Sequence, residues 1–472
     1  IGFNLTPGKL LLQAMGEEQL TGTGTDACEQ EQSALLHQYV LSASAAAEPP
    51  TEWSCRGPRS VSPFSPCAGS RIPHIFAAAR LSEDDVLYDL GCGDGRVLHE
   101  AAARYGCRSV GIEVDEACLV SCREGAAALG PEAESLFRWE LADITQLPED
   151  FFLTGQLPGQ EEPLPPASVV MVFITGHGLV ALADWLHRAW RAAQGGRGVR
   201  LLTCVESLDT AVDYNDGVFA ETNRQGWEVY RDPVHAKYGV FVVPPCGVGL
   251  HEWQSSAPLP VPMCREMATA AEPVVLRGLL SADDIAAIGA FMESVDAACP
   301  GGAEDAESAI AGVLFGPGDE WVDAEDAVHS LREHRVTHLH REGMDQRPLR
   351  QVRAKLLRAM YKTDAAHWNL LRGRSVYVRS FEHHSYEPGG SVSDPEHRDD
   401  GSLLTLSVLL GRSADCEGGV LRTWGGEAWQ PLAVDRGDAV VFVSEKRHNV
   451  TPITSGTRCS LVMELWEGGV TR

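Results

Sequence analysis

Residues 86–96 read VLYDLGCGDGR, and this stretch decides the fold of the N-terminal half. Its first five residues suit a buried strand, and an Ala-rich helical segment follows to Tyr105. The glycines between them let the backbone turn tightly and approach a ligand, because no Cβ stands in the way. Strand-like and helix-like runs then alternate to about residue 243, which predicts a parallel α/β sheet.

Two acidic residues mark the ends of the next two predicted strands. Glu113 closes SVGIE (109–113), about 20 residues after the loop, where a carboxylate can accept hydrogen bonds from both ribose hydroxyls. Asp143 closes LFRWELAD (136–143), where it could bind an adenine amino group. The GxGxG spacing differs from the GxGxxG of dinucleotide-binding loops. The pattern indicates a pocket for a nucleoside cofactor.

These motifs resemble those of class I S-adenosylmethionine-dependent methyltransferases. PFSP (63–66) and DLGCGDGRV (89–97) are similar to the ATP synthase c-subunit lysine methyltransferase family and its bacterial relatives. The resemblance covers roughly residues 61–243 and implies a Rossmann-like fold and possible protein-lysine N-methyltransferase activity. It also implies that five residues bind S-adenosylmethionine, namely Asp89, Gly91, Gly93, Glu113 and Asp143.

The acceptor side departs from that family. TGHG (175–178) follows the fourth strand in place of the family's segment, and no aromatic turn is recognisable around VESLD (205–209). His177 could face a substrate, or it could be a solvent-facing loop residue. Two further alternatives stay open: the glycine loop only makes a tight turn, or the domain binds the cofactor without transferring methyl groups. Methyl transfer depends mainly on in-line positioning, so no residue need reveal it.

The C-terminal half carries candidate metal ligands. His397 and Asp399 form an HxD unit, and residues two apart on an extended segment project to the same side. His448 follows 49 residues later, after the strand-like DAVVFV (438–443). Two imidazoles and one carboxylate occupy one face of Fe(II) and leave the other open. Arg458 lies ten residues further on, and its guanidinium can bind a carboxylate bidentately.

Together these residues resemble the prolyl 4-hydroxylase-like 2-oxoglutarate oxygenases. YEPGG (386–390), GGVL (418–421) and RGDAVVF (436–442) agree with that family, whose fold is a double-stranded β-helix. The resemblance implies Fe(II) at His397, Asp399 and His448, 2-oxoglutarate on Arg458, and ascorbate as a candidate additional cofactor. The implied reaction converts 2-oxoglutarate to succinate and carbon dioxide while the substrate is hydroxylated. The gap between Tyr386 and His397 is longer than in collagen-type enzymes, so proline is one candidate substrate among others.

Other clusters of metal-binding residue types receive no metal in this interpretation. His329, His334, His338 and His340 form one group, and His383 and His384 form another, without paired carboxylates or thiolates at ligand spacing. The 13 cysteines include no CxxC pair, which favours free thiols in a reducing compartment.

Composition limits the partners and the compartment. The net charge of -27 repels nucleic-acid backbones, and no apolar run is long enough to span a membrane. We expect an intracellular, cytoplasmic protein. The chain begins with Ile1 rather than Met, so mitochondrial targeting stays open.

We therefore predict two domains: an α/β Rossmann-like methyltransferase domain, then a mainly β double-stranded β-helix (jelly-roll) oxygenase domain with N-terminal helices. The predicted boundaries are a partly disordered extension at 1–60, the methyltransferase-like domain at 61–245, a Pro-rich linker at 246–270 and the oxygenase at 271–472. The expected function is hydroxylation of a protein substrate, possibly prolyl, fused to methyl transfer. The alternatives are a regulatory scaffold that senses S-adenosylmethionine, or two domains that act on small metabolites.

Overall fold

The structure is a computed structural model that describes residues 61–194, 198–211, 225–298, 333–340 and 347–469. These described residues all belong to one compact unit. The extension expected at 1–60 and His329 lie outside the described residues. None of the helices in the described ranges combines the length and the hydropathy that a bilayer crossing needs.

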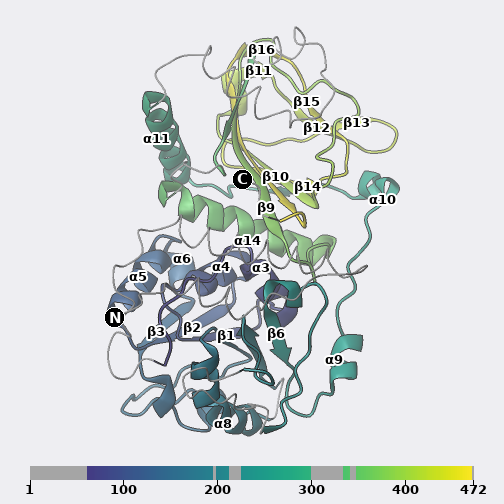
Figure 1. Cartoon of the computed structure of the whole chain (residues 1–472). Coiled ribbons are helices and arrows are strands. Elements are labelled where there is room, and N and C mark those ends of the chain that lie inside the picture. Colours follow the sequence, from purple (N-terminus) through teal and green to yellow (C-terminus); the bar gives the residue numbers. More distant parts are fainter. Residues whose placement is uncertain (1–60, 195–197, 212–224, 299–332, 341–346, 470–472) are drawn as a thin grey trace, which may run out of the picture. The chain divides into compact units, whose positions relative to one another are not determined.

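The N-terminal domain is built on a six-stranded sheet with the order β3-β2-β1-β4-β5-β6 (Figure 1). The strands are β1 (Val86–Leu90), β2 (Arg108–Glu113), β3 (Phe137–Leu141), β4 (Val169–Val172), β5 (Arg200–Cys204) and β6 (Val240–Val243). All neighbouring strands are parallel except β5 and β6. The strand order reverses between β1 and β4, and ligands bind beyond the carboxyl ends of the strands at such a point.

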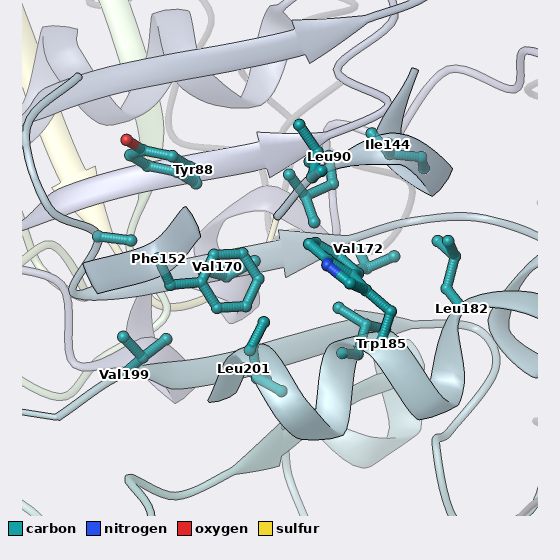
Figure 2. Close-up of a cluster of buried hydrophobic side chains, with 14 of the residues drawn as sticks. Tyr88, Leu90, Ile144, Phe152, Val170, Val172, Leu182, Trp185, Val199 and Leu201 are labelled. Atoms are coloured by element: carbon teal, nitrogen blue, oxygen red, sulfur yellow. The ribbon is translucent and has the colours of Figure 1, made fainter. Parts of the chain in front are cut away.

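Helices cover both faces of this sheet because successive strand residues point to opposite sides. Tyr88 and Leu90 pack with Trp185 of α8 (Gly176–Ala192) on one face, as Figure 2 shows. Leu87 packs on the other face with helices α3 (Ile72–Ala79) and α4 (Arg96–Tyr105). Helix α5 (Glu116–Ala127) adds Leu119 to that second cluster. Burial of each large apolar side chain contributes about 1.5–3 kcal/mol, so the two layers hold the strand ends in place.

The segment expected as a linker carries two short helices, α9 (Leu250–Ser255) and α10 (Arg265–Ala270). Trp253 of α9 is buried, and the Arg80 guanidinium lies 3.6 Å from its ring centroid. Ala268 of α10 is fully buried in the core of the second domain. The Pro and Gly content therefore predicts the irregular path of this segment, but two apolar side chains attach it to packed cores.

The C-terminal domain contains a six-stranded antiparallel sheet and two smaller ones. The large sheet has the order β7-β14-β10-β17-β9-β8, and the small sheets are β13-β12-β15 and β11-β16. The large sheet comprises β7 (Val274–Leu276), β8 (His334–His338), β9 (Tyr377–Tyr386), β10 (Leu404–Leu409), β14 (Ala439–Val443) and β17 (Arg458–Trp466). The smaller strands are β11 (Cys416–Gly418), β12 (Leu421–Trp424), β13 (Trp429–Pro431), β15 (His448–Val450) and β16 (Ile453–Gly456).

The two faces of the large sheet differ in polarity. Leu404 and Leu406 of β10 and Met463 of β17 pack on one face with α14 (Arg350–His367). Thr405 of β10 and the polar β17 residues point to the opposite face, where Phe442 of β14 packs against the small sheet of β12 and β15. The alternation thus directs a set of polar side chains to the space between two sheets. Both predicted fold classes are confirmed.

The predicted N-terminal helices of this domain are also present. Helix α11 (Ala282–Ala298) begins after Ser281, whose hydroxyl accepts a hydrogen bond from the Asp284 N–H (3.1 Å). The Asp284 carboxylate in turn accepts the Ser281 N–H (2.8 Å), which makes a reciprocal cap.

Candidate functional site

The HxD segment lies between β9 and β10 and is held by backbone hydrogen bonds. The Asp399 N–H donates to the Ser444 carbonyl (3.1 Å), and the His448 N–H donates to the His397 carbonyl (3.2 Å). The two parts of the chain that carry the candidate ligands are therefore joined directly, although His448 comes 51 residues after His397.

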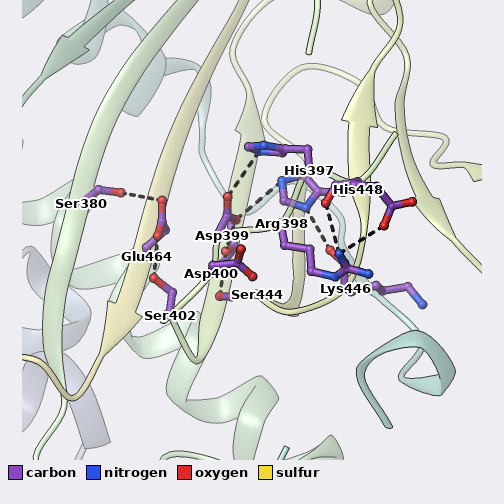
Figure 3. A network of polar contacts seen from close by, with 12 residues as sticks. Ser380, His397, Arg398, Asp399, Asp400, Ser402, Ser444, Lys446, His448 and Glu464 are labelled. Carbon is purple, nitrogen blue, oxygen red and sulfur yellow. Dashed lines mark hydrogen bonds and ion pairs between the residues drawn. The ribbon is translucent and has the colours of Figure 1, made fainter. Parts of the chain in front are cut away.

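The three candidate metal ligands converge in the described structure (Figure 3). One ligand atom from each of His397, Asp399 and His448 lies within 4.8 Å of the others. Nε2 of His397 is 3.5 Å from Asp399 Oδ1, and Nε2 of His448 is 3.6 Å from Asp399 Oδ2. Two imidazole nitrogens and one carboxylate at this spacing suit a non-haem Fe(II) ion with open positions.

Neighbouring groups orient two of these ligands. Thr405 Oγ1 donates to Asp399 Oδ2 (2.5 Å) and contacts Ser444 Oγ (2.9 Å). His448 Nδ1 lies 3.1 Å from the Lys446 carbonyl, which can accept only if Nδ1 carries the proton. Nε2 of His448 is then the unprotonated nitrogen, and it faces Asp399. Such outer contacts fix ring orientation and tautomer in metal sites.

The charges of the triad depend on one another. Burial lowers the pKa of His448 despite the nearby Asp399 carboxylate. The hydrogen bond to Asp399 raises the pKa of His397. Burial alone would raise the pKa of Asp399, but His448, His397 and Thr405 together hold it below its ordinary value. Asp399 therefore stays ionised, as a metal ligand must.

Arg458 opens β17 and is buried, with 3% of its surface exposed. Its Nη1 donates to Ser460 Oγ (2.8 Å), and its Nε has no hydrogen-bond partner. Among the described residues no carboxylate forms an ion pair with it, and burial lowers its pKa. A buried guanidinium without an anion leaves a large desolvation cost uncompensated, so the site fits an anionic ligand.

Glu464, also on β17, is an acidic group close to the triad (Figure 3). Its carboxylate accepts hydrogen bonds from Ser402 Oγ (2.6 Å) and Ser380 Oγ (3.2 Å). Burial and the Asp399 charge raise its pKa to about 7. The sequence interpretation did not single out Glu464, because its only signal is an acidic residue in a mostly apolar strand.

A second group of residues with metal-ligating atoms within 4.8 Å comprises His338, His340 and Glu382. The Phe381 N–H donates to Nδ1 of His340 (3.1 Å), so the proton of neutral His340 is on Nε2. His338 Nδ1 already contacts Glu382 Oε1 (3.0 Å). Hydrogen bonding therefore accounts for this group without a metal. The sequence interpretation missed Glu382, which joins the two histidine clusters and directly precedes His383 and His384.

The glycine loop lies at the reversal of strand order, between β1 and α4. Gly91, Gly93 and Gly95 all have positive φ, which a side chain would strain. The Gly91 N–H donates to the Ile112 carbonyl (2.8 Å). A Cβ on Gly93 would lie 2.4 Å from Cε2 of Phe64, so the PFSP segment contacts this loop. The loop therefore needs glycine at these positions because of the positive φ angles, and at Gly93 also because the Phe64 ring lies so close.

Glu113 and Asp143 lie beyond the strands that precede them. Glu113 Oε2 accepts the Gly93 N–H (2.9 Å), and its Oε1 accepts the N–H groups of Val114 (2.8 Å) and Asp115 (3.1 Å). Asp143 Oδ1 accepts the Thr145 N–H (2.9 Å) and begins a short 3-10 helix. Glu113 is thus attached to the glycine loop, whereas Asp143 also has a local capping role.

Asp89 is the most unusual member of this group. It is 2% exposed, and among the described residues nothing donates a hydrogen bond to its Oδ1. Burial, Glu113 and Asp94 raise its pKa to about 7. His177, by contrast, is exposed in the first turn of α8, beyond β4. A buried acid without a donor fits a cationic ligand group at the glycine loop.

Comparison with known proteins agrees with this description of the N-terminal domain. Residues 87–154 match the family model described as a methyltransferase domain. A protein-lysine N-methyltransferase from Saccharolobus islandicus (strain REY15A) is 36% identical over 55 residues, which are 11% of this chain. The match spans 34% of that protein, about a third of its length. The region from β1 to α7 (Phe151–Thr154) thus forms a methyltransferase domain.

Solved structures similar to this chain include EvdMO1 and a prolyl-4-hydroxylase from Pseudomonas putida. EvdMO1 is 18% identical with a TM-score of 0.29, over 84% of this chain and 91% of that chain. The prolyl-4-hydroxylase is 18% identical with a TM-score of 0.26, over 43% of this chain and 97% of that chain. The family match lies in the domain with the six-stranded Rossmann-like sheet, and a mainly antiparallel β domain follows it in the chain.

Proposed function

We propose that the C-terminal domain is an Fe(II)- and 2-oxoglutarate-dependent oxygenase and that the N-terminal domain binds S-adenosylmethionine for methyl transfer. The observation that carries the proposal is Arg458: a buried guanidinium without an anion, in the domain that also gathers His397, Asp399 and His448. A dicarboxylic acid that also binds iron satisfies both features at once. A purely structural role would leave the buried charge uncompensated.

The residues divide this work as follows. His397, Asp399 and His448 would hold Fe(II), and Thr405 and the Lys446 carbonyl keep Asp399 and His448 in ligating orientation. Arg458, positioned by Ser460, would bind a 2-oxoglutarate carboxylate. With molecular oxygen as oxidant, the bound iron and keto-acid would supply a centre at which 2-oxoglutarate becomes succinate and carbon dioxide, with one oxygen atom entering succinate and the other the hydroxyl group of the substrate. The role of ascorbate as an additional cofactor stays a prediction, and no contact among the described residues supports it.

In the methyltransferase domain, Asp89 would bind the ammonium group of S-adenosylmethionine and Glu113 its ribose. The cofactor supplies a methyl group on a sulfonium for in-line transfer to a nucleophile. Gly91, Gly93 and Asp143 complete the proposed pocket. We propose a protein substrate, with lysine as the first methyl acceptor to test because the matched relative is a protein-lysine N-methyltransferase. Proline is the first hydroxylation target to test.

Succinate formation tests the oxygenase half. Protein loaded anaerobically with iron is given 2-oxoglutarate and then oxygen, with wild type compared with Asp399→Ala and Arg458→Ala. We expect succinate from wild type and strongly reduced formation from both variants. Cell extract is added as a source of substrate because such oxygenases turn over slowly without one.

Calorimetry tests the cofactor half. Wild-type protein should release or absorb heat on titration with S-adenosylmethionine, and Asp89→Asn should bind it more weakly. If wild type makes no succinate even with extract but binds S-adenosylmethionine, the regulatory-scaffold alternative replaces the oxygenase. If succinate forms only with small-molecule fractions of the extract, the metabolite alternative replaces the protein substrate.

A further inference from the structure

A string of hydrogen-bonded side chains runs along β8 and β9 on the polar face of the large sheet. The register pairs His334 with Tyr386 and His338 with Glu382, so these side chains are direct neighbours. Glu382 lies between two imidazoles: Oε1 is 3.0 Å from His338 Nδ1, and Oε2 is 3.1 Å from His384 Nε2. His384 Nδ1 is 2.9 Å from His334 Nε2 and 3.4 Å from the Tyr386 hydroxyl.

The donors and acceptors of this string have one consistent direction. A carboxylate only accepts, so His338 Nδ1 and His384 Nε2 both carry protons. With its proton on Nε2, His384 offers a single in-plane lone pair on Nδ1, and the closer His334 Nε2–H occupies it. The Tyr386 hydroxyl proton is thereby left free to donate elsewhere. Without Glu382 at the centre, nothing would fix these tautomers.

The same string of side chains also holds the aromatic ring of Tyr386 in position. The His334 ring stacks on it with 3.9 Å between centroids and an angle of 15°. The Arg458 guanidinium lies 5.4 Å from the Tyr386 ring centroid, and Tyr386 pairs with Arg458 in the sheet register. Tyr386 is 3% exposed. Its ring therefore stacks on a neutral imidazole and also lies close to the buried cation.

The charges within the string favour this arrangement. Burial and His384 lower the pKa of His334 to about 3, so this ring stays neutral and adds no second cation beside Arg458. Burial alone would raise the pKa of Glu382, but hydrogen bonds from His338 and His384 hold it well below its usual range. Glu382 is thus a fixed acceptor.

We propose that His338, Glu382, His384 and His334 are positioning residues that hold Tyr386 as a second donor for the carboxylate bound by Arg458. This inference rests on the proposed oxygenase function. It assigns a role to His334, His338 and His384, three of the histidines that received no metal in the sequence interpretation. The string acts on the co-substrate through Tyr386, and its hydrogen bonds among the described residues of β8 and β9 involve none of the candidate iron ligands.

The experiment measures 2-oxoglutarate binding by full-length protein loaded anaerobically with Fe(II), using calorimetry and the visible absorption of the iron–keto-acid complex. The variants are Glu382→Gln, Tyr386→Phe and the double variant, with Glu417→Gln as an exposed control of the same chemistry. Glutamine has the shape of glutamate but presents an amide donor to one imidazole N–H. The tautomers then have to change, and Tyr386 loses its fixed orientation.

We expect each single variant to weaken 2-oxoglutarate binding about tenfold, which corresponds to about 1.4 kcal/mol. The double variant should bind no more weakly than Tyr386→Phe, because both changes act through one hydroxyl. Iron affinity and Glu417→Gln should match wild type. If Glu382→Gln does not fold, His338→Ala at the far end of the string replaces it, with an expected threefold to fivefold loss.

Two outcomes overturn the positioning role. One is wild-type affinity for 2-oxoglutarate in the folded Glu382 or His338 variant. The other is a double variant whose losses multiply, since independent effects are additive in free energy. Failure of the proposed oxygenase function is distinguishable, because wild type itself would then bind no 2-oxoglutarate in the presence of iron.

Discussion

The two candidate sites hold buried charges of opposite sign. Asp89 in the methyltransferase domain is a buried acid without a hydrogen-bond donor at Oδ1, and Arg458 in the β-helix domain is a buried cation without an acid among the described residues. Other acids of the two sites are hydrogen-bonded: Glu113 accepts three N–H donors, and Asp399 accepts the Thr405 hydroxyl. The sign of the uncompensated charge indicates the sign of the missing ligand group.

The comparison also predicts how the sites differ energetically. A carboxyl group can escape an unfavourable burial by binding a proton, and the pKa of Asp89 is raised to about 7. A guanidinium cannot lose its proton in this way near neutral pH. The free-energy cost of burying the charge without a ligand should therefore be larger at Arg458 and independent of pH. At Asp89 this cost should be smaller and should depend on pH.

The largest expected effect is that of Arg458→Met. Loss of a charged, bidentate contact should weaken 2-oxoglutarate binding more than hundredfold, or by roughly 3 kcal/mol. The ligand-free protein should nevertheless become more stable by about 1 kcal/mol, because a buried cation is removed, and this raises Tm by about 2–4 °C. Calorimetry and thermal unfolding with and without 2-oxoglutarate measure both effects. Arg412→Met, at an exposed position, is the control. A fall in the ligand-free Tm would show that Arg458 has a structural partner.

The second prediction concerns Asp89 and pH. Its raised pKa means that the folded protein binds a proton up to about pH 7, and this proton must leave before a cationic group binds. Affinity for S-adenosylmethionine should therefore fall as pH drops below 7, by up to about tenfold per unit. The stability of the ligand-free protein changes in the opposite direction. It falls as pH rises from the pKa of Asp89 in the unfolded chain, near 3.8, to its pKa in the folded protein, about 7.

Asp89→Asn should remove this pH dependence and weaken binding about tenfold at pH 8, as measured by calorimetry between pH 6 and 8. Asp150→Asn, an exposed acid in the same domain, is the control. If Asp89→Asn keeps the wild-type pH profile, another group near the loop accounts for it, and the symmetry between the two sites is broken.

A site is easier to predict from the sequence when its residues lie close together along the chain. The glycine loop, Glu113 and Asp143 follow consecutive strands, so a short motif predicts their place at the sheet edge, which matches the observed β1, β2 and β3. The HxD unit and His448 needed a family spacing, because their convergence depends on backbone pairing between residues 51 positions apart. The sequence nevertheless predicted the convergence of all three.

Sequence reasoning missed the residues whose roles depend on contacts between segments that are far apart in the sequence. Thr405 and the Lys446 carbonyl are ordinary in sequence, and their contacts with Asp399 and His448 follow from strand register. Glu382 joins two histidine clusters because β8 pairs with β9, and β8 has no strong strand signal. The strand-like alternation of Glu382, His384 and Tyr386 was the available signal, since residues two apart share a face.

The smallest expected effect is that of Ser460→Ala, and it tests whether Arg458 is held in place or only buried. Ser460 is 1% exposed, and its hydroxyl accepts a hydrogen bond from Arg458 Nη1, at 2.8 Å. Removing this acceptor should cost about 0.5–1 kcal/mol, because the guanidinium keeps its charge but gains freedom to turn. We expect a twofold to fivefold weaker affinity for 2-oxoglutarate by calorimetry, with exposed Ser455→Ala as the control. A loss as large as that of Arg458→Met would mean that the orientation of the guanidinium, and not its uncompensated charge, dominates the site, and the comparison with Asp89 would then no longer hold.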